Sequence, residues 1–266
     1  MKTQNPNAFE WEVSAYTVAK RARLSNVRRL IGTGELLDLF SKDAKGENDY
    51  SLKPFVRSNS LFVHIPKTAG MSIARALYGC LGLGHASLAE YRRLLRPRAL
   101  SRMFKFTFVR NPFDRIHSAY HFLASGGVEG VDATFNEEVL SKFRSFEHFI
   151  LEGLERDEVA SFWHFRSSSE FLSYVPGEPV DLNFIGRFET LDRDFDFVRS
   201  RVNPRAALGR SNFTGPKRDY RKEFTAEMIA RVSHRYSTDL QLFGYDFEGA
   251  TGSPALAGDS QPTIRP

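Results

Sequence analysis

Short apolar runs of strand length alternate with helical patterns through the middle of the chain. Residues 60–65 (SLFVHI) form the first run, and a helical pattern follows over 73–79. Residues 104–109 (FKFTFV) form the second run, and a turn containing RNP separates it from a helical pattern over 113–123. Two consecutive strand-to-helix units predict a parallel sheet with helices on its faces. The pattern therefore predicts an α/β fold.

The same alternation continues toward the C-terminus. Residues 182–186 (LNFIG) predict a third strand, and residues 189–202 predict the helix that follows it. A closing pair of helical segments is expected over 224–244. These elements extend the sheet and its helical covering rather than starting a second domain, because a chain of 266 residues is short for two generous domains.

The two ends of the chain have a different character. Residues 9–40 predict a helix with a basic middle. A solvated helix face is the ordinary explanation of its charge, and a basic arm for a polyanion or a membrane surface is the alternative. Residues 41–54 gather charged residues, Gly and Pro as a linker does. The expected organisation is a helical N-terminal extension (1–57), one α/β domain (58–248) and a disordered, Pro-rich tail (249–266).

Composition narrows the class of protein. The chain is 41% hydrophobic and 26% charged, which is ordinary for a soluble globular protein, and no stretch approaches the ~18 apolar residues of a membrane span. The opening residues lack the apolar core of a signal peptide. Cys80 is the single cysteine, so an intramolecular disulfide is excluded and a reducing compartment fits. We therefore expect a soluble, cytoplasmic protein without integral membrane association.

The segment LFVHIPKTAGMS is a candidate anion-binding loop. It joins a strand to a helix, where several backbone N–H groups and the positive end of the helix dipole point outward. A lysine, two hydroxyls and a glycine add a charge, donors and room for a ligand. The spacing is not that of a Walker A loop, and an ordinary tight turn remains the alternative. The candidate contacts are Pro66, Lys67, Thr68, Ala69, Gly70, Met71 and Ser72.

A second candidate anion site follows the second strand, in FVRNPFDRIHSAYHF. Asn111 is expected to cap the helix, and Asp114 lies near its positive end. Arg110 and Ser118 are placed to converge on one phosphate, although Arg110 capping nearby carbonyls is the alternative. Two such loops at neighbouring strand ends are what a nucleotide with two anionic groups requires.

These segments carry a family resemblance. HIPKTAGMS resembles the 5'-phosphosulfate loop of the carbohydrate sulfotransferase superfamily, and VRNPFDRIHSAY resembles its 3'-phosphate motif. GHASLAEY, the HF pair at 164–165, FIGRFETLDRDF and SNFTGPKRDYRKEF are similar in order and spacing, so the resemblance covers roughly 60–247. The most similar branch holds heparan sulfate 2-O-sulfotransferases, chondroitin 4-O-sulfotransferases and their bacterial counterparts. Two departures are the missing N-terminal anchor and Met71, where the family often has Gly or Thr.

The resemblance implies a fold and a chemistry. The fold is a single P-loop-like domain with a central parallel sheet flanked by helices. The chemistry is transfer of a sulfuryl group from 3'-phosphoadenosine 5'-phosphosulfate (PAPS) to a carbohydrate hydroxyl, leaving 3',5'-ADP, with no metal. A bacterial cytoplasmic enzyme is the simplest reading, and the acceptor and the oligomeric state stay open.

Roles for individual residues follow from the resemblance. Lys67 stabilises the leaving phosphate, His85 is the general base, and Glu90 or His164 is the alternative base. His64 is expected to be structural. The cofactor contacts, beyond the first loop, are Arg110, Ser118, Thr214 and Lys217; the substrate contacts are His164 and Arg187.

Two other functions remain in view. An ATP-dependent phosphotransferase on a P-loop-like fold would need Mg²⁺ and an acidic ligand beyond the second strand, where this chain has Arg110. A noncatalytic polyanion binder is supported only by the net charge of +5. Because no nucleic-acid recognition module is present, nucleic acid is not an expected partner.

Overall fold

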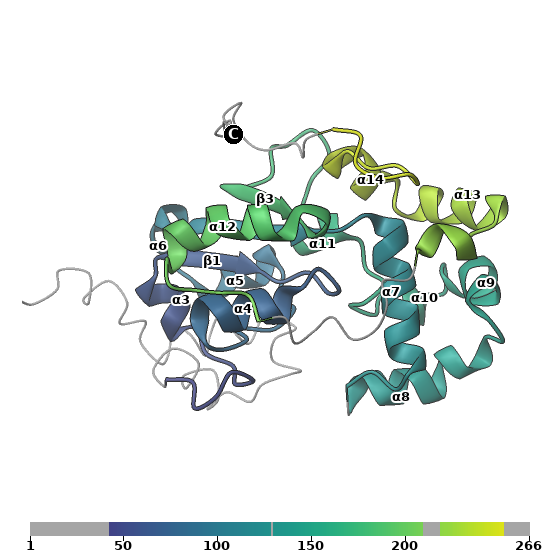
Figure 1. Ribbon diagram of the computed structural model, residues 1–266, viewed down its shortest axis with the longest axis horizontal. Coiled ribbons are helices and arrows are strands. Elements are labelled where there is room, and N and C mark those ends of the chain that lie inside the picture. Colours follow the sequence, from purple (N-terminus) through teal and green to yellow (C-terminus); the bar gives the residue numbers. More distant parts are fainter. Residues whose placement is uncertain (1–42, 129, 210–218, 253–266) are drawn as a thin grey trace, which may run out of the picture.

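A three-stranded parallel sheet forms the centre of the molecule. The computed structural model describes residues 43–128, 130–209 and 219–252. Strands β1 (Ser60–Val63), β2 (Phe104–Val109) and β3 (Phe184–Arg187) lie in the order β1-β2-β3 (Figure 1). The predicted α/β class and parallel sheet are confirmed. The first strand is shorter than expected, because the chain turns into the loop after Val63.

Phenylalanine side chains dominate one face of this sheet. Phe62, Phe106 and Phe184 occupy paired positions on the three strands, and the Phe62 and Phe106 rings stack with centroids 5.0 Å apart. Aromatic cross-strand pairs of this kind stabilise a sheet and fix its register. Phe108 has room beside β3 because its partner is Gly186, where an added Cβ would lie 2.5 Å from the Phe108 ring.

Helices cover this sheet, and each strand is followed by one. Helix α12 packs along β3 and also meets α4, while α3 lies against β1 (Figure 1). Ser87 and Glu90 form a capping box at the start of α5, and Pro97 opens α6. The helices of this group are α3 (Lys53–Arg57), α4 (Gly70–Tyr78), α5 (Leu88–Leu94), α6 (Pro97–Arg102) and α12 (Leu191–Val202), with the short η5 (Phe188–Thr190) before α12.

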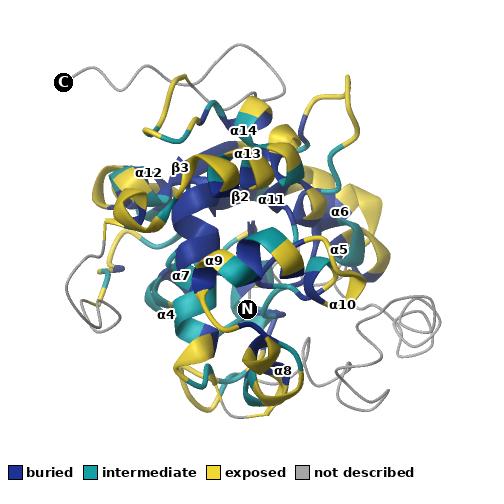
Figure 2. Cartoon of the chain, turned by 90° about the vertical axis from the view of Figure 1, so that its right-hand side faces the viewer, coloured by how far each residue is buried: buried dark blue, intermediate teal, exposed yellow. Residues whose placement is uncertain are grey.

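A second hydrophobic cluster lies beside the sheet and is built from helices and the turns between them, without residues of the strands. Helix α7 (Pro112–Ala124) leads into it directly from β2, and most of α7 is buried, whereas α8 and α12 carry many exposed residues (Figure 2). The other elements of this cluster are α8 (Val131–Glu138), η3 (Leu140–Lys142), α9 (Phe146–His148), η4 (Phe149–Gly153), α10 (Asp157–Ala160), η7 (Tyr220–Glu223) and α13 (Ala226–Arg235). Helices α11 (Ser168–Phe171) and α14 (Ser237–Phe243) instead place Phe171, Leu242 and Phe243 in the core around the sheet.

The start of α7 follows the local rules that the sequence suggested. The side-chain oxygen of Asn111 accepts a hydrogen bond from the N–H of Phe113 at 3.0 Å, and Pro112 occupies the first turn. The Asn111 amide also donates to the carbonyl of Asp246 at 2.7 Å. The cap thus ties the end of β2 to a C-terminal segment.

Three expectations fall outside the described residues. They concern the helix over 9–40, the greater part of the tail beyond residue 252, and the loop with Thr214 and Lys217. Among the helices of the described part, none combines the length and the apolar character needed to cross a bilayer.

Candidate active site

The loop between β1 and α4 has an unusual backbone. Lys67 and Ala69 both adopt left-handed conformations, with φ of 66° and 65°, although neither is glycine. The Thr68 hydroxyl donates to the carbonyl of Ile65 at 2.8 Å and holds the turn closed. Strain of this kind concentrates at ligand-binding sites, where the surrounding structure maintains it. Pro66 and Thr68 are buried, whereas Met71 stands exposed in the first turn of α4 beside Ser72.

Gly70 packs directly against His64. An added Cβ would lie 1.8 Å from Cδ2 of His64, so the absence of a side chain makes room for the histidine ring, and the expected contact of the Gly70 backbone with the cofactor stays a prediction. His64 is buried, and burial, followed by the charges of His85 and His164, holds its pKa well below the usual value. The expected structural role of His64 agrees with this packing.

Gly70→Ala should therefore destabilise the fold, because the new methyl group forces the His64 ring out of its place. We expect a loss of roughly 1–3 kcal/mol of unfolding free energy in denaturant titrations. Gly46→Ala is the matched control, since an added Cβ there meets no atom within 4 Å. Equal stability of the two variants would show that the His64 ring moves freely.

Lys67 projects toward an aromatic ring at the edge of the second cluster. Its Nζ lies 3.7 Å from the centroid of the Phe122 ring. Burial lowers the pKa of Lys67 to about 8, and the charge of Arg110 acts in the same direction. The ammonium is therefore mostly charged at neutral pH and only partly hydrated, which strengthens its attraction for an anion.

Arg110 joins the two candidate anion loops. Its Nη1 donates to the carbonyl of Lys67 at 3.1 Å, although the two residues lie far apart in the chain. Its Nε and Nη2 donate to the two carboxylate oxygens of Asp114, each at 2.8 Å, and its guanidinium stacks on Phe188. The Asp114 carboxylate is thus the main local partner of Arg110, instead of the neighbouring carbonyls that the alternative interpretation named. It orients the guanidinium, whose remaining N–H groups are the ones available to a phosphate.

Ser118 lies one turn beyond Asp114 on α7 and is half-buried. Residues four apart share a helix face, so Asp114 stands between Arg110 and Ser118.

Asp114 also lines a cleft of about 290 Å³, together with Glu189 and Asp219. Such a lining disfavours an anion, so the phosphate loop is the better candidate site.

His85 is held beside the phosphate loop by the backbone of the loop itself. Its Nδ1 lies 3.2 Å from the carbonyl oxygen of His64, and the two rings have centroids 4.3 Å apart. A carbonyl accepts only from a protonated nitrogen, so this contact favours the tautomer in which Nε2 carries the lone pair. Burial lowers the pKa of His85 to about 4, with the charge of His164 as the next cause. The imidazole is therefore neutral at physiological pH.

His164 reaches the same place from the second cluster. Its ring centroid lies 6.1 Å from that of His85, and its Nε2 lies 3.3 Å from Oδ1 of Asp132. Burial lowers the pKa of His164, and Asp132 opposes this shift. Lys67 contributes to the lowered pKa of both His85 and His164, so the three side chains share one electrostatic environment.

Two residues of this site were missed by sequence reasoning. Asp132 faces His164, and Arg115 donates to the carbonyls of His164 and Arg166, at 3.2 and 2.5 Å, from a fully buried position on α7. Nothing in the local sequence distinguishes Asp132 from an ordinary acid in the first turn of a helix. Arg115 likewise looks like a solvated residue of an amphipathic helix, and only the packing reveals its buried partners.

The remaining candidates have structural surroundings. Glu90 accepts hydrogen bonds from the N–H and the hydroxyl of Ser87, at 2.7 and 2.9 Å, and this capping role competes with a role as base. Arg187 is buried at the end of β3, where it donates to the carbonyls of Phe243 and Gly252 and stacks on Tyr245. Its contacts tie the C-terminal segment to the sheet.

One of the comparisons with known proteins identifies the family. A model of the sulfotransferase family matches residues 56–246, which include β1, the phosphate loop, His85, Arg110 and β3. The chain belongs to the sulfotransferase family. Neither the search of curated proteins nor the search of solved structures gave a match. The sulfotransferase is thus a transferase of sulfuryl groups, and the matched span contains every described residue of the candidate site.

Proposed function

We propose that this sulfotransferase transfers a sulfuryl group from PAPS to a hydroxyl of a carbohydrate, as the branch with 2-O- and 4-O-sulfotransferases does. The observation that carries the proposal is the hydrogen bond from Arg110 to the Lys67 carbonyl, which joins two cationic loops beside His85. A nucleotide with one anionic group on each side fits such a pair of loops. The match to the family model supports the chemistry, and the same model gives no support to an ATP-dependent kinase or a polyanion-binding module.

Each residue of the site has a proposed part in an in-line displacement. The acceptor oxygen forms a bond to sulfur while the bond from sulfur to the phosphate oxygen breaks, and the acceptor proton passes to Nε2 of His85. Lys67 and the backbone N–H groups of the loop stabilise the charge that develops on the leaving phosphate. Arg110 and Ser118 hold the 3'-phosphate, and Thr214 and Lys217 are proposed to complete the nucleotide site.

The acceptor side of the site is proposed to be formed by the second cluster. Aromatic rings pack around His164. The ring centroids of Trp163 and Phe122 lie 6.1 and 5.5 Å from the centroid of the His164 ring. Aromatic surfaces of this kind are suited to the apolar faces of a sugar ring. Arg187 stays a proposed substrate contact: its Nη2 donates to two backbone carbonyls, whereas its buried Nη1 has no hydrogen-bond partner among the described residues. The single cysteine of the chain, Cys80, is a buried free thiol. This suits the reducing compartment that we propose for the enzyme.

Binding of 3',5'-ADP tests the nucleotide assignment directly. The product nucleotide should raise the melting temperature in the presence of EDTA, because the two loops provide cations and N–H groups without a metal. Arg110→Ala should remove most of that shift, while Arg205→Ala, which alters an exposed arginine, should retain it. Stabilisation by ATP with Mg²⁺ and not by 3',5'-ADP would contradict the proposal. Transfer of labelled sulfuryl groups across a panel of saccharides then identifies the acceptor.

A further inference from the structure

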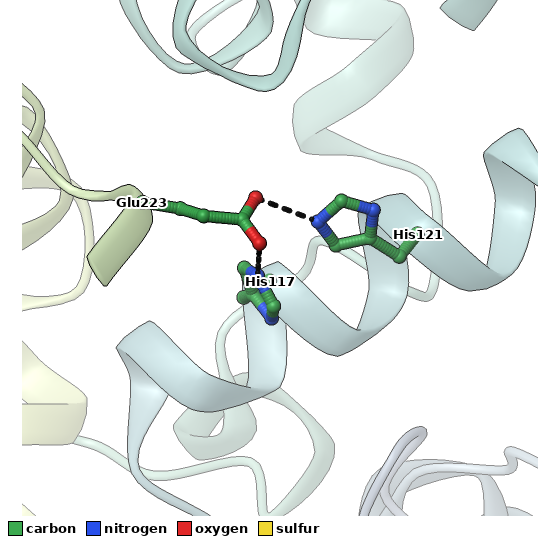
Figure 3. Close-up of side chains that lie close together, drawn as sticks. All are labelled: His117, His121 and Glu223. Carbon is green, nitrogen blue, oxygen red and sulfur yellow. Dashed lines mark hydrogen bonds and ion pairs between the residues drawn. The ribbon is translucent and has the colours of Figure 1, made fainter. Parts of the chain in front are cut away.

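Three side chains of the kind that bind metals meet beside α7, apart from the His85 and His164 pair. His117 and His121 lie one helical turn apart on the same face of α7, and Glu223 approaches from η7 (Figure 3). One carboxylate oxygen of Glu223 lies 3.1 Å from Nε2 of His117, and the other lies 3.0 Å from Nε2 of His121. The proposed transfer reaction uses none of the three.

The spacing of these atoms suits a metal ion. The ligand atoms of the three residues all lie within 4.8 Å of one another. Two ligands at tetrahedral positions around Zn²⁺ are separated by about 3.4 Å, given metal–ligand distances near 2.1 Å. The observed separations of 3.0 and 3.1 Å from imidazole to carboxylate are close to this value. Only small side-chain movements are needed to place an ion between the three groups.

Burial adds to the geometric argument. The His117 side chain is only 5% exposed, and the contact of its Nε2 with the Glu223 carboxylate falls short of a well-formed hydrogen bond. A buried polar nitrogen with a poorly formed partner is less well stabilised than one with a good partner. A metal ion between the two groups would improve this arrangement, because it accepts the nitrogen lone pair and attracts the carboxylate.

We propose that His117, His121 and Glu223 form a binding site for a divalent transition-metal ion, with Zn²⁺ as the best-fitting ion. Two imidazoles at i and i+4 on a helix with one carboxylate from another element are a known zinc ligand set, with water as the fourth ligand. Mg²⁺ is disfavoured because it prefers oxygen ligands and octahedral geometry. The expectation of no metal came from the nucleotide chemistry, whereas this site lies outside it.

The proposed ion has a structural consequence. It would connect α7, which begins two residues after Arg110, to η7, whose Tyr220 hydroxyl already donates to the carbonyl of Phe247 at 2.6 Å. An ion that binds only the folded chain stabilises it in proportion to the logarithm of its free concentration. The melting temperature should therefore rise with Zn²⁺ concentration.

Direct metal binding tests the proposal. Tag-free protein freed of metal by chelator and dialysis should bind one Zn²⁺ per chain in calorimetry and melt at a higher temperature with Zn²⁺, but not with Mg²⁺. His121→Ala and Glu223→Gln should each weaken Zn²⁺ binding by about tenfold or more. Removal of a residue that only supports a metal ligand already costs about this much, and these residues are proposed to be ligands themselves. These two side chains are partly exposed, so both variants should fold.

Matched controls exclude nonspecific binding. His234→Ala and Glu227→Gln alter exposed residues of α13 and should leave the Zn²⁺ affinity unchanged. Absence of stoichiometric binding, or binding that His121→Ala and Glu223→Gln leave intact, overturns the proposal. The outcome is independent of the proposed nucleotide, since neither measurement requires PAPS or 3',5'-ADP.

Discussion

Lys67→Ala should lower turnover by about 10²- to 10³-fold, the usual cost of removing one preorganised group that stabilises developing charge. Affinity for 3',5'-ADP should change far less, because Arg110 and the loop N–H groups remain. The reason lies in the placement of the ammonium, partly buried above the Phe122 ring at the strained loop. Single-turnover rates and calorimetric binding of 3',5'-ADP measure the two quantities separately.

The pH dependence identifies the charge of Lys67 as the active property. Because its pKa is about 8 in the free protein, kcat/KM should fall as the pH rises above this value and the ammonium loses its proton. Lys67→Arg keeps a permanent charge and should shift this alkaline decline to much higher pH, even if its rate is lower. An alkaline limb that stays in place in Lys67→Arg, or equal losses of rate and binding in Lys67→Ala, would reduce Lys67 to an anchor.

His85→Ala should lower kcat by about 10²- to 10⁴-fold and leave 3',5'-ADP binding nearly unchanged, because a positioned proton acceptor contributes this much to a transfer reaction. The carbonyl of His64 orients the ring so that Nε2 is the accepting nitrogen. Since the pKa of His85 is about 4, the imidazole stays neutral down to that pH. In the free enzyme, kcat/KM should therefore decline only as the pH falls toward about 4.

Parallel variants distinguish His85 from its rivals. His164→Ala should mainly raise the acceptor KM, and Glu90→Ala should mainly destabilise the start of α5 through loss of the capping box. A wild-type kcat in His85→Ala together with a large loss in His164→Ala would transfer the role of base to His164, with Asp132 as its orienting partner. The sulfotransferase assignment would stand in either case.

Much of the fold is predictable because it depends on local patterns. The second strand was expected at the residues where it occurs, and Asn111 caps α7 as its side-chain chemistry requires. The helix over 189–202 begins two residues later than expected, because Phe188–Thr190 form a 3-10 turn first. Hydrophobic periodicity and capping chemistry act over a few residues, so one sequence is sufficient to detect them.

The chemistry of the site depended partly on tertiary packing. The sequence by itself determined the α/β class, the loop with Lys67, the position of Arg110 after β2, and the resemblance that names His85. Only the tertiary structure showed that the Arg110 guanidinium forms a salt bridge with Asp114. It also showed that Gly70 makes room for the His64 ring and that Asp132 faces His164. The first two contacts join residues four and six positions apart, but the backbone conformation that brings them together is set by the fold. The contact of Asp132 with His164 joins distant segments, and their fit to one another is a property of the packed core.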